Sequence, residues 1–347
     1  MPATSIDTFF ACILIVLVVV LSMAATTRIV APYISGLQDV NEEEYLRKIV
    51  EYILVNSGSP EGWGQNQSVT PEVFGLATAD SFSYELDVDK VSRLNSQNVY
   101  ALNYFEMFDS VRLDTVALRF SFSQIMDVSI SLDSNVTVAG STTYSFNVSV
   151  SREQAPVASS LQCYLVANNF LGNATSSTSS SGQGTVEMVV PNDSNGTALL
   201  IVFARSPYDA RLTARGVYVF GHLSSEPLST NTFLDLSPLN NTLQVDPNVS
   251  GLSLESAYEF SYDYHSALIS TSNETYSVTD FLDLSPNVLV VTGWNDSDFF
   301  VEWTTYPQVP LEMGANFEDA DCFSFNYVVT IGGVFYRFNV QCGGPSL

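Results

Sequence analysis

Basic residues are scarce in this sequence. Lysine and arginine together number 12 against 37 aspartates and glutamates, which gives a formal net charge of −25. From Val217 onward the only base is Arg337. Such a chain repels the phosphate backbone of DNA and RNA, so nucleic acid is excluded as a partner. The acidic residues instead indicate a solvated exterior.

The residue patterns of catalytic and transition-metal sites are also missing. The two histidines, His222 and His265, have no ligand partner at helical or hairpin spacing, and no CxxC pair occurs. The sequence contains no GxSxG, no HExxH and no glycine-rich phosphate loop. We therefore expect a protein that is not an enzyme and needs no cofactor.

The acidic composition favours calcium over transition metals as a candidate ion, because Ca²⁺ takes oxygen ligands from acidic loops. Segments 193–196, 295–298 and 318–321 could each supply two or three such ligands. None of them matches a complete calcium loop, and solvated acidic turns are the simpler interpretation.

A long run without charge is the most distinctive feature that is present. It extends from Thr8 to Thr27 and is bracketed by Asp7 and Arg28. About 20 helical residues span roughly 30 Å, the thickness of the hydrocarbon core of a bilayer. Because the run is apolar on every side, it predicts a retained membrane helix. A cleavable secretory signal is the alternative, but the chain has no basic segment before Asp7 and the run is too long.

An amphipathic helix is predicted to continue from this run. After Arg28 apolar residues recur every three to four positions up to Leu54. Pro32 lacks a backbone donor and should bend the helix, and the segment 56–60 should stop it. We therefore assign 1–57 to a transmembrane and amphipathic helix and 58–110 to a connecting α/loop segment.

The remainder of the chain is predicted to be β structure. Apolar and polar residues alternate in short segments such as 115–122, 128–132 and 144–150, which is typical of antiparallel strands. We expect an immunoglobulin-like β-sandwich over 111–223, and a second β domain or an extension of the first over 224–347. The predicted fold class is mainly β with a long N-terminal α-helix.

The C-terminus is predicted to form a hairpin. Gly332 and Gly333 form a two-residue turn between the alternating segments 322–331 and 334–342. Folding about this turn brings Cys322 almost opposite Cys342, which predicts a disulfide in an oxidising exterior. The third outer cysteine, Cys163, would then be a buried free thiol.

The hexapeptide Phe-Leu-Asp-Leu-Ser-Pro occurs twice, at Phe233–Pro238 and Phe281–Pro286. The repeat indicates two related β units, or two equivalent strand ends that each stop at Ser-Pro. The functional alternative is that Asp235 and Asp283 act as paired ligands. The aromatic residues raise a similar choice, because Trp63, Trp294 and Trp303 could bind a sugar or could belong to the core.

Acceptor sequences for N-glycosylation occur only beyond the predicted helix, which points this region outward. They begin at Asn66, Asn135, Asn147, Asn173, Asn192, Asn195, Asn240, Asn248, Asn273 and Asn295.

The N-terminus resembles that of archaeal type IV pilin-like proteins. The resemblance lies in Ala3-Thr4-Ser5-Ile6-Asp7, the apolar helix that follows and its proline-containing extension. Segments 58–64, 75–77 and 86–91 are similar to the part that follows the helix in some of those membrane-anchored proteins, so the resemblance covers about the first 95 residues. Departures are Asp where pilins commonly have Glu, and Met1-Pro2 where the family usually has a basic leader.

The resemblance implies a role for Asp7. In a filament such a carboxylate lies beside the amino terminus of a neighbouring subunit, and pairing would favour assembly because an unpaired buried charge is costly. The alternative is that Asp7 lies in the lipid headgroup layer or favours the positive end of the helix.

These observations predict a non-enzymatic, extracellular structural or adhesive surface protein. It would be a pilin-like subunit, anchored or polymerised through its N-terminal helix, with Asp7 and Pro32 as assembly residues. Its partners would be the membrane, identical or related pilin subunits, and a surface glycan or envelope ligand. The alternative is a monomeric, signal-anchored ectodomain that binds a ligand or an envelope component. In both cases the C-terminal region lies outside the cell.

Overall fold

The computed structural model describes residues 3–79, 84–112, 116–224, 232–272, 274–279, 283–317 and 322–343. Within the N-terminal helix it describes the side chains of 11, 13–24 and 28, and those from 42 onward. The chain divides into two compact units, Met1–Glu51 and Tyr52–Leu347.

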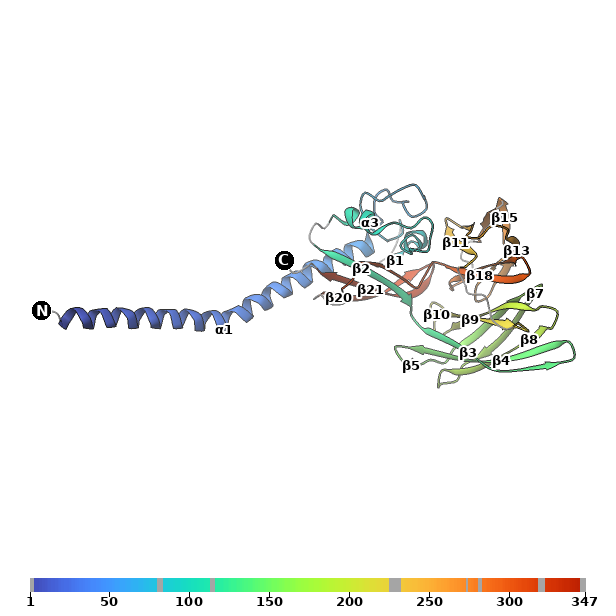
Figure 1. Ribbon diagram of the computed structural model, residues 1–347, viewed down its shortest axis with the longest axis horizontal. Coiled ribbons are helices and arrows are strands. Elements are labelled where there is room, and N and C mark those ends of the chain that lie inside the picture. Colours follow the sequence, from blue (N-terminus) through green and yellow to red (C-terminus); the bar gives the residue numbers. More distant parts are fainter. Residues whose placement is uncertain are drawn as a thin grey trace. The chain divides into compact units, whose positions relative to one another are not determined.

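Helix α1 (Ala3–Val55) is drawn in blue in Figure 1. Its backbone stays helical at Pro32, and it ends directly before the predicted stop at 56–60. The side chains of Asp7, Cys12 and Pro32 lie outside the described residues, so the proposed assembly roles stay predictions. In the part of the chain that the structure describes, no helix combines the length and apolar character needed to cross a membrane.

The two halves of α1 differ in how their side chains are covered. The large apolar residues from Ile13 to Leu21, and Met23, are 45–67% exposed. Toward the C-terminal end Leu46, Val50 and Leu54 are buried, at the three-to-four-residue spacing predicted for an amphipathic helix.

The described residues of the second unit form two short helices and five sheets. The helices are α2 (Val88–Ser92) and α3 (Tyr104–Val111). The C-terminal sheet has the order β1 (Glu85–Leu86), β20 (Phe323–Ile331), β21 (Val334–Gly343), β2 (Ala117–Gln124) and β19 (Leu311–Gly314). Only β1 in this sheet is parallel to its neighbour, β20.

Two sheets face each other in the first sandwich. The first outer sheet comprises β3 (Asp127–Val138), β4 (Ser141–Arg152), β5 (Ala155–Pro156) and β8 (Gln183–Pro191). The first inner sheet has the order β10 (Thr213–His222), β9 (Gly196–Arg205), β6 (Ser160–Ala167) and β7 (Phe170–Ser177). Alternate residues of β4, including Phe146 and Val148, pack with Leu165 and Val202 of the inner sheet.

The second sandwich repeats this layering. The second inner sheet has the order β14 (His265–Ala267), β13 (Ser253–Phe260), β17 (Asn287–Asn295) and β18 (Asp298–Tyr306). The second outer sheet has the order β11 (Leu234–Leu239), β12 (Thr242–Pro247), β16 (Thr275–Ser277) and β15 (Ile269–Ser272). Leu236 and Val245 pack with Leu289 and Val291 between them.

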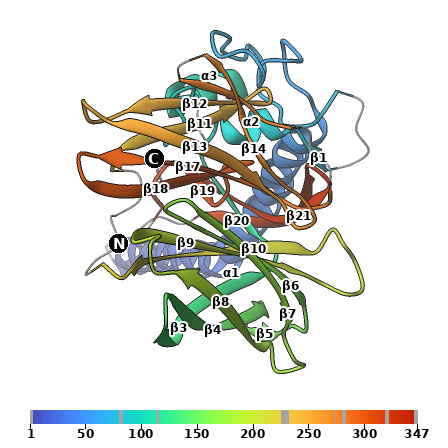
Figure 2. The same cartoon turned by 90° about the vertical axis from the view of Figure 1, so that its right-hand side faces the viewer.

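A third apolar cluster joins the two inner sheets. Ile201 and Phe203 of β9 pack with Phe260 of β13 and Val290 of β17. The four sheets are therefore stacked, and Figure 2 shows β12, β13, β9 and β8 in successive layers. The result is a mainly β protein with several antiparallel sheets, as predicted.

Strand pairing also crosses the boundary that we placed between residues 223 and 224. Strand β2, from the first predicted β segment, pairs with β19 and β21 from the second. The backbone hydrogen bonds of β2 therefore join the two predicted β segments in one sheet.

The predicted C-terminal hairpin is confirmed, but the disulfide is not formed. Strands β20 and β21 meet at Gly332 and Gly333, which have φ of +56° and +80°. Cys163, Cys322 and Cys342 all carry free thiols. The register pairs Cys342 with Phe323, one residue beyond Cys322. Cys322 lies just before β20 and is therefore not the residue directly opposite Cys342 in the ladder.

Candidate functional site

Trp63 lies at the centre of the segment that follows α1. Its side chain is fully buried, its Nε1 donates to Gly75 O (3.1 Å), and its ring lies 5.8 Å from that of Phe74. A Cβ at Gly58, where φ is +79°, would come within 2.9 Å of Trp63 Nε1. The glycines around Trp63 therefore allow the backbone to close over the indole.

Arg93 of the same region is 3% exposed and is satisfied entirely by backbone carbonyls. Its Nη1 donates to Trp63 O (2.5 Å), Asn66 O (3.0 Å) and Val69 O (2.9 Å), and its Nε donates to Tyr100 O (2.9 Å). Burial lowers the pKa of the Arg93 guanidinium, while Glu106 and Asp89 oppose that shift. One side chain thus fixes three turns of a segment that has little regular structure.

Lys90 does the same for the adjoining turns. It is 1% exposed, and its Nζ donates to Ser57 O and Ala77 O, both at 2.8 Å. A Cβ on Gly64 would lie 2.5 Å from Lys90 Cγ, so glycine is required there. We call Trp63, Gly75, Lys90 and Arg93 the Trp63 cluster. The contacts of this cluster give a physical reason for the glycines and the tryptophan in segments 58–64 and 75–77, on which part of the family resemblance rests.

Asp89 links α2 to the second sandwich. Its Oδ1 accepts from Tyr306 Oη (2.5 Å) and from the backbone N–H of Asn240 (2.8 Å). Burial raises the pKa of Asp89, and both hydrogen bonds act against that rise. The carboxyl therefore connects α2 with the end of β18 and with the turn between β11 and β12.

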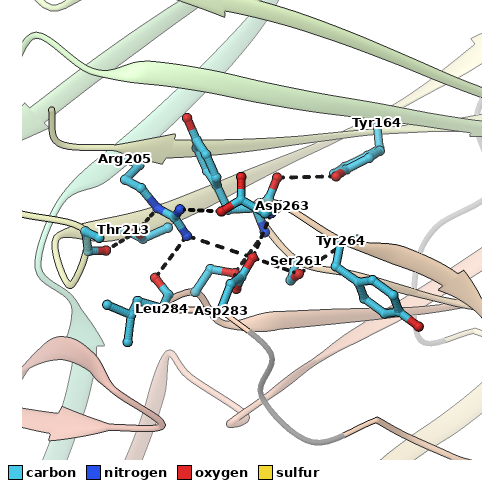
Figure 3. A network of polar contacts seen from close by, with 11 residues as sticks. Tyr164, Arg205, Thr213, Ser261, Asp263, Tyr264, Asp283 and Leu284 are labelled. Carbon is cyan, nitrogen blue, oxygen red and sulfur yellow. Dashed lines mark hydrogen bonds and ion pairs between the residues drawn. The ribbon is translucent and has the colours of Figure 1, made fainter.

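Arg205 organises a polar network between the two inner sheets, shown in Figure 3. Its Nη1 donates to Asp263 Oδ2 (2.7 Å), its Nε donates to Thr213 Oγ1 (3.0 Å), and its guanidinium lies 3.8 Å from the ring centroid of Tyr262. Asp283 Oδ2 lies 3.9 Å from Arg205 Nη2. The network fixes the loop after β13 to the end of β9.

The two hexapeptides differ in the part that the structure describes, which leaves out Phe281 and Leu282 of the second copy. In the first copy Asp235 lies in β11 and accepts from Asn248 Nδ2 (3.0 Å). In the second copy Asp283 precedes β17 and accepts from Ser261 Oγ (3.0 Å) and Asp263 N (2.7 Å). The two aspartates thus serve different loops and do not form a ligand pair with each other.

Both serines of the repeat have a common role. Ser237 and Ser285 are fully buried, and the Oγ of each accepts a backbone N–H, from Val99 and Tyr262 respectively (2.9 Å in both cases). The serine of the repeated Ser-Pro therefore accepts a hydrogen bond from a distant backbone N–H in both copies.

The two histidines differ in burial, because His222 lies in packed surroundings and His265 is exposed. His222 is buried, with Nδ1 2.9 Å from Tyr144 Oη and Nε2 2.9 Å from Pro191 O. Burial lowers the pKa of His222. Among the described residues no group of three or more histidine, cysteine, aspartate and glutamate side chains could hold a metal ion. The acidic segment 318–321 lies outside those residues, so the calcium hypothesis stays untested there.

Every described acceptor asparagine reaches the surface. Asn192 and Asn295 are partly exposed, Asn273 lies outside the described residues, and the remaining seven are exposed: Asn66, Asn135, Asn147, Asn173, Asn195, Asn240 and Asn248. Exposure permits modification at these positions, but their glycosylation stays a prediction.

The three thiols are expected to differ in reactivity. Burial raises the pKa of Cys163 to about 12 and that of Cys342 to about 12, so at pH 8 roughly one thiol in ten thousand is ionised. Cys322 is partly exposed. Of these three, we expect only Cys322 to be alkylated by iodoacetamide in the folded chain, as measured by peptide mass spectrometry. If Cys322 is not alkylated in the folded chain until a reductant is added, a disulfide does form.

Sequence patterns gave no sign of a pocket beside the end of β18. It has a volume of about 270 Å³, and its lining includes Asn95, Gln97, Arg215, Trp303 and Thr304. Arg215 is 7% exposed, and its Cζ lies 5.3 Å from the ring centroid of Trp303. The residues come from three distant parts of the sequence, so spacing alone could not group them.

Comparisons with known proteins do not identify a family. No family model and no curated protein matches the chain. Among solved structures, HBP35 of Porphyromonas gingivalis is similar at a TM-score of 0.21 and 14% sequence identity, over 52% of this chain and 63% of that one. The chain thus spans less than two thirds of that protein's length, and a similarity at this level carries no argument about function.

Proposed function

We propose that this protein is a non-enzymatic surface subunit of pilin-like type, held in a membrane or a filament by α1, with its β sheets outside. The observation that carries the proposal is the uncovered apolar surface of α1. Its residues from Ile13 to Leu21 are at least 45% exposed on every side of the helix. Burial of one such side chain is worth about 1.5–3 kcal/mol, so this surface favours lipid or the helices of other subunits.

The proposed task is structural or adhesive. The buried ionisable groups Lys90, Arg93 and Asp89 each form hydrogen bonds that join separate segments of the chain, which supports a structural task. Exposed acceptor asparagines on several strands agree with an extracellular surface.

Substitution of Asp7 tests assembly separately from anchoring. We expect the chain with Asp7→Ala to remain in the membrane fraction and to be lost from sheared filaments, because the carboxylate no longer pairs with a neighbouring amino terminus. Asp39→Ala, on the same helix beyond the apolar run, is the matched control and should assemble normally. Mass spectrometry of the native N-terminus shows whether the mature chain begins near Ala3.

Two outcomes would contradict the proposal. Sheared filaments that contain the Asp7→Ala chain at the wild-type level would remove the role of the acid. Recovery of the wild-type chain only as detergent-extracted monomers, with Met1 intact, would favour the monomeric ectodomain instead. That second candidate is supported by the pocket beside β18, which offers a ligand site with no need for assembly.

A further inference from the structure

Arg215 is a buried cation without a buried anion. Its Nη2 donates to Val309 O (2.6 Å) and Thr305 Oγ1 (3.1 Å), both neutral acceptors. Its Nε and Nη1 have no acceptor among the described residues. No carboxylate of the described residues forms an ion pair with Arg215. By contrast Arg47, Arg119 and Arg211 are each paired with a carboxylate.

Lys90 and Arg93 are also buried without an ion pair and are held by backbone carbonyls, but Arg215 differs from them because it lines a pocket. Burial without a counter-charge lowers the pKa of Arg215 to about 10, with the phenol of Tyr336 acting in the opposite direction. A buried charge that is left unpaired is costly, so a retained one calls for a partner. In this part of the structure no such partner comes from the protein.

The other free polar groups of the pocket are also hydrogen-bond donors. Trp303 Nε1 is buried and has no acceptor among the described residues. Gln97 is exposed at the pocket, and its side-chain amide has no partner among them either. Neither aspartate nor glutamate lines the pocket. The guanidinium of Arg215, the indole of Trp303 and the amide of Gln97 therefore each have N–H groups without an acceptor among the described residues, and the described lining of the pocket holds no carboxylate.

The volume of the pocket and its other lining residues restrict the kind of ligand that it can hold. At about 270 Å³ the space is slightly smaller than the pockets of roughly 300 Å³ and more that hold drug-sized ligands. The indole of Trp303 and the ring of Pro310 offer apolar surface, while Asn95 and Thr304 are polar. This combination suits a single sugar ring that carries an acidic group.

We propose that the pocket beside β18 binds a carboxylate-bearing monosaccharide of the hexuronic acid type, with the carboxylate on Arg215 and the ring against Trp303. The guanidinium would accept a carboxylate in its planar, two-pronged geometry, and Gln97 would close the open side. The site goes beyond anchoring through α1, because binding at this pocket requires neither membrane nor filament.

A titration of the indole N–H signals of the full-length chain in detergent tests the site. The chain has three tryptophans, and a Trp303→Phe variant assigns the relevant signal by its disappearance. We expect D-glucuronate to shift the Trp303 signal and to leave those of Trp63 and Trp294 in place. Glucose, the neutral analogue, and acetate, the carboxylate without a ring, should each bind at least tenfold more weakly.

Two substitutions separate recognition from folding. Gln97→Glu places a negative charge at the exposed edge of the pocket and should weaken glucuronate binding at least tenfold. Gln183→Glu makes the same charge change on an exposed position of β8 and should have no effect. Arg215→Met should abolish binding where the variant folds, and Gln97→Glu carries the test where it does not.

The proposal is overturned if glucuronate leaves the Trp303 signal unchanged in the wild-type chain, if glucose or acetate binds as tightly, or if Gln97→Glu binds like the wild type. Each of these results can be obtained on detergent-dispersed chain. Loss of the sugar site and loss of assembly through Asp7 are therefore distinguishable.

Discussion

Replacing Arg93 with methionine is expected to lower the free energy of unfolding by about 3–5 kcal/mol. Methionine keeps the apolar stem and much of the contact with Trp63, so the loss comes from the guanidinium. Four backbone carbonyls, those of Trp63, Asn66, Val69 and Tyr100, lose their donor at once. An unsatisfied buried acceptor costs about 1–3 kcal/mol, and partial hydration of the more exposed turns reduces the sum.

Urea unfolding of the full-length chain in one detergent measures the effect. Arg152→Met is the control, because the exposed Arg152 side chain forms no hydrogen bond or ion pair with the described residues, and the expected change is within about 0.5 kcal/mol. Arg93→Lys should fall between the two, since a single ammonium cannot reach four carbonyls. Equal stability of Arg93→Met and the wild type would show that the carbonyls are solvated in the folded chain.

The same cluster shows which part of the sequence was interpretable in advance. The glycines near Trp63 stood out as part of a resemblance, but their physical reason appears only with Lys90 and Arg93 in place. Gly64 is required because the Lys90 side chain crosses it at a distance too short for a Cβ. Such a requirement joins residues 26 positions apart or more, and no local pattern reveals it.

Local patterns did predict the strands and the last turn. The alternation in 144–150 corresponds to β4, whose residues are buried at every second position, and Gly332-Gly333 forms the turn between β20 and β21. The predicted disulfide is absent, and the register places Phe323, not Cys322, opposite Cys342, a shift of one residue from the pairing that we expected. Counting residues from the turn of a hairpin predicts which backbone segments lie close together. It predicts which side chains lie opposite each other only when the register of the strands is known.

The stacking of the two sandwiches had a signal that we did not use. Residues 198–204 of β9 are all buried, and their sequence is an unbroken apolar run instead of an alternation. A run of this kind is typical of a strand covered on both faces. The pocket beside β18 had no comparable signal, because Arg215 and Trp303 meet only through the folding of separate sheets.

Replacing Phe203 with alanine is expected to destabilise both sandwiches together, by about 3–5 kcal/mol. Phe203 is fully buried in the cluster between the inner sheets, where its ring lies 6.2 Å from that of Tyr164, and the cavity left by its removal would touch both β9 and β13. Because this cluster joins the sandwiches, urea unfolding of the β unit should remain a single transition with a lower midpoint. Phe105→Ala is the matched control, since Phe105 is 76% exposed and its loss should change stability by less than about 0.5 kcal/mol. If Phe203→Ala instead splits the transition so that the sandwiches unfold at different urea concentrations, the shared cluster adds little to stability and the β unit behaves as two domains.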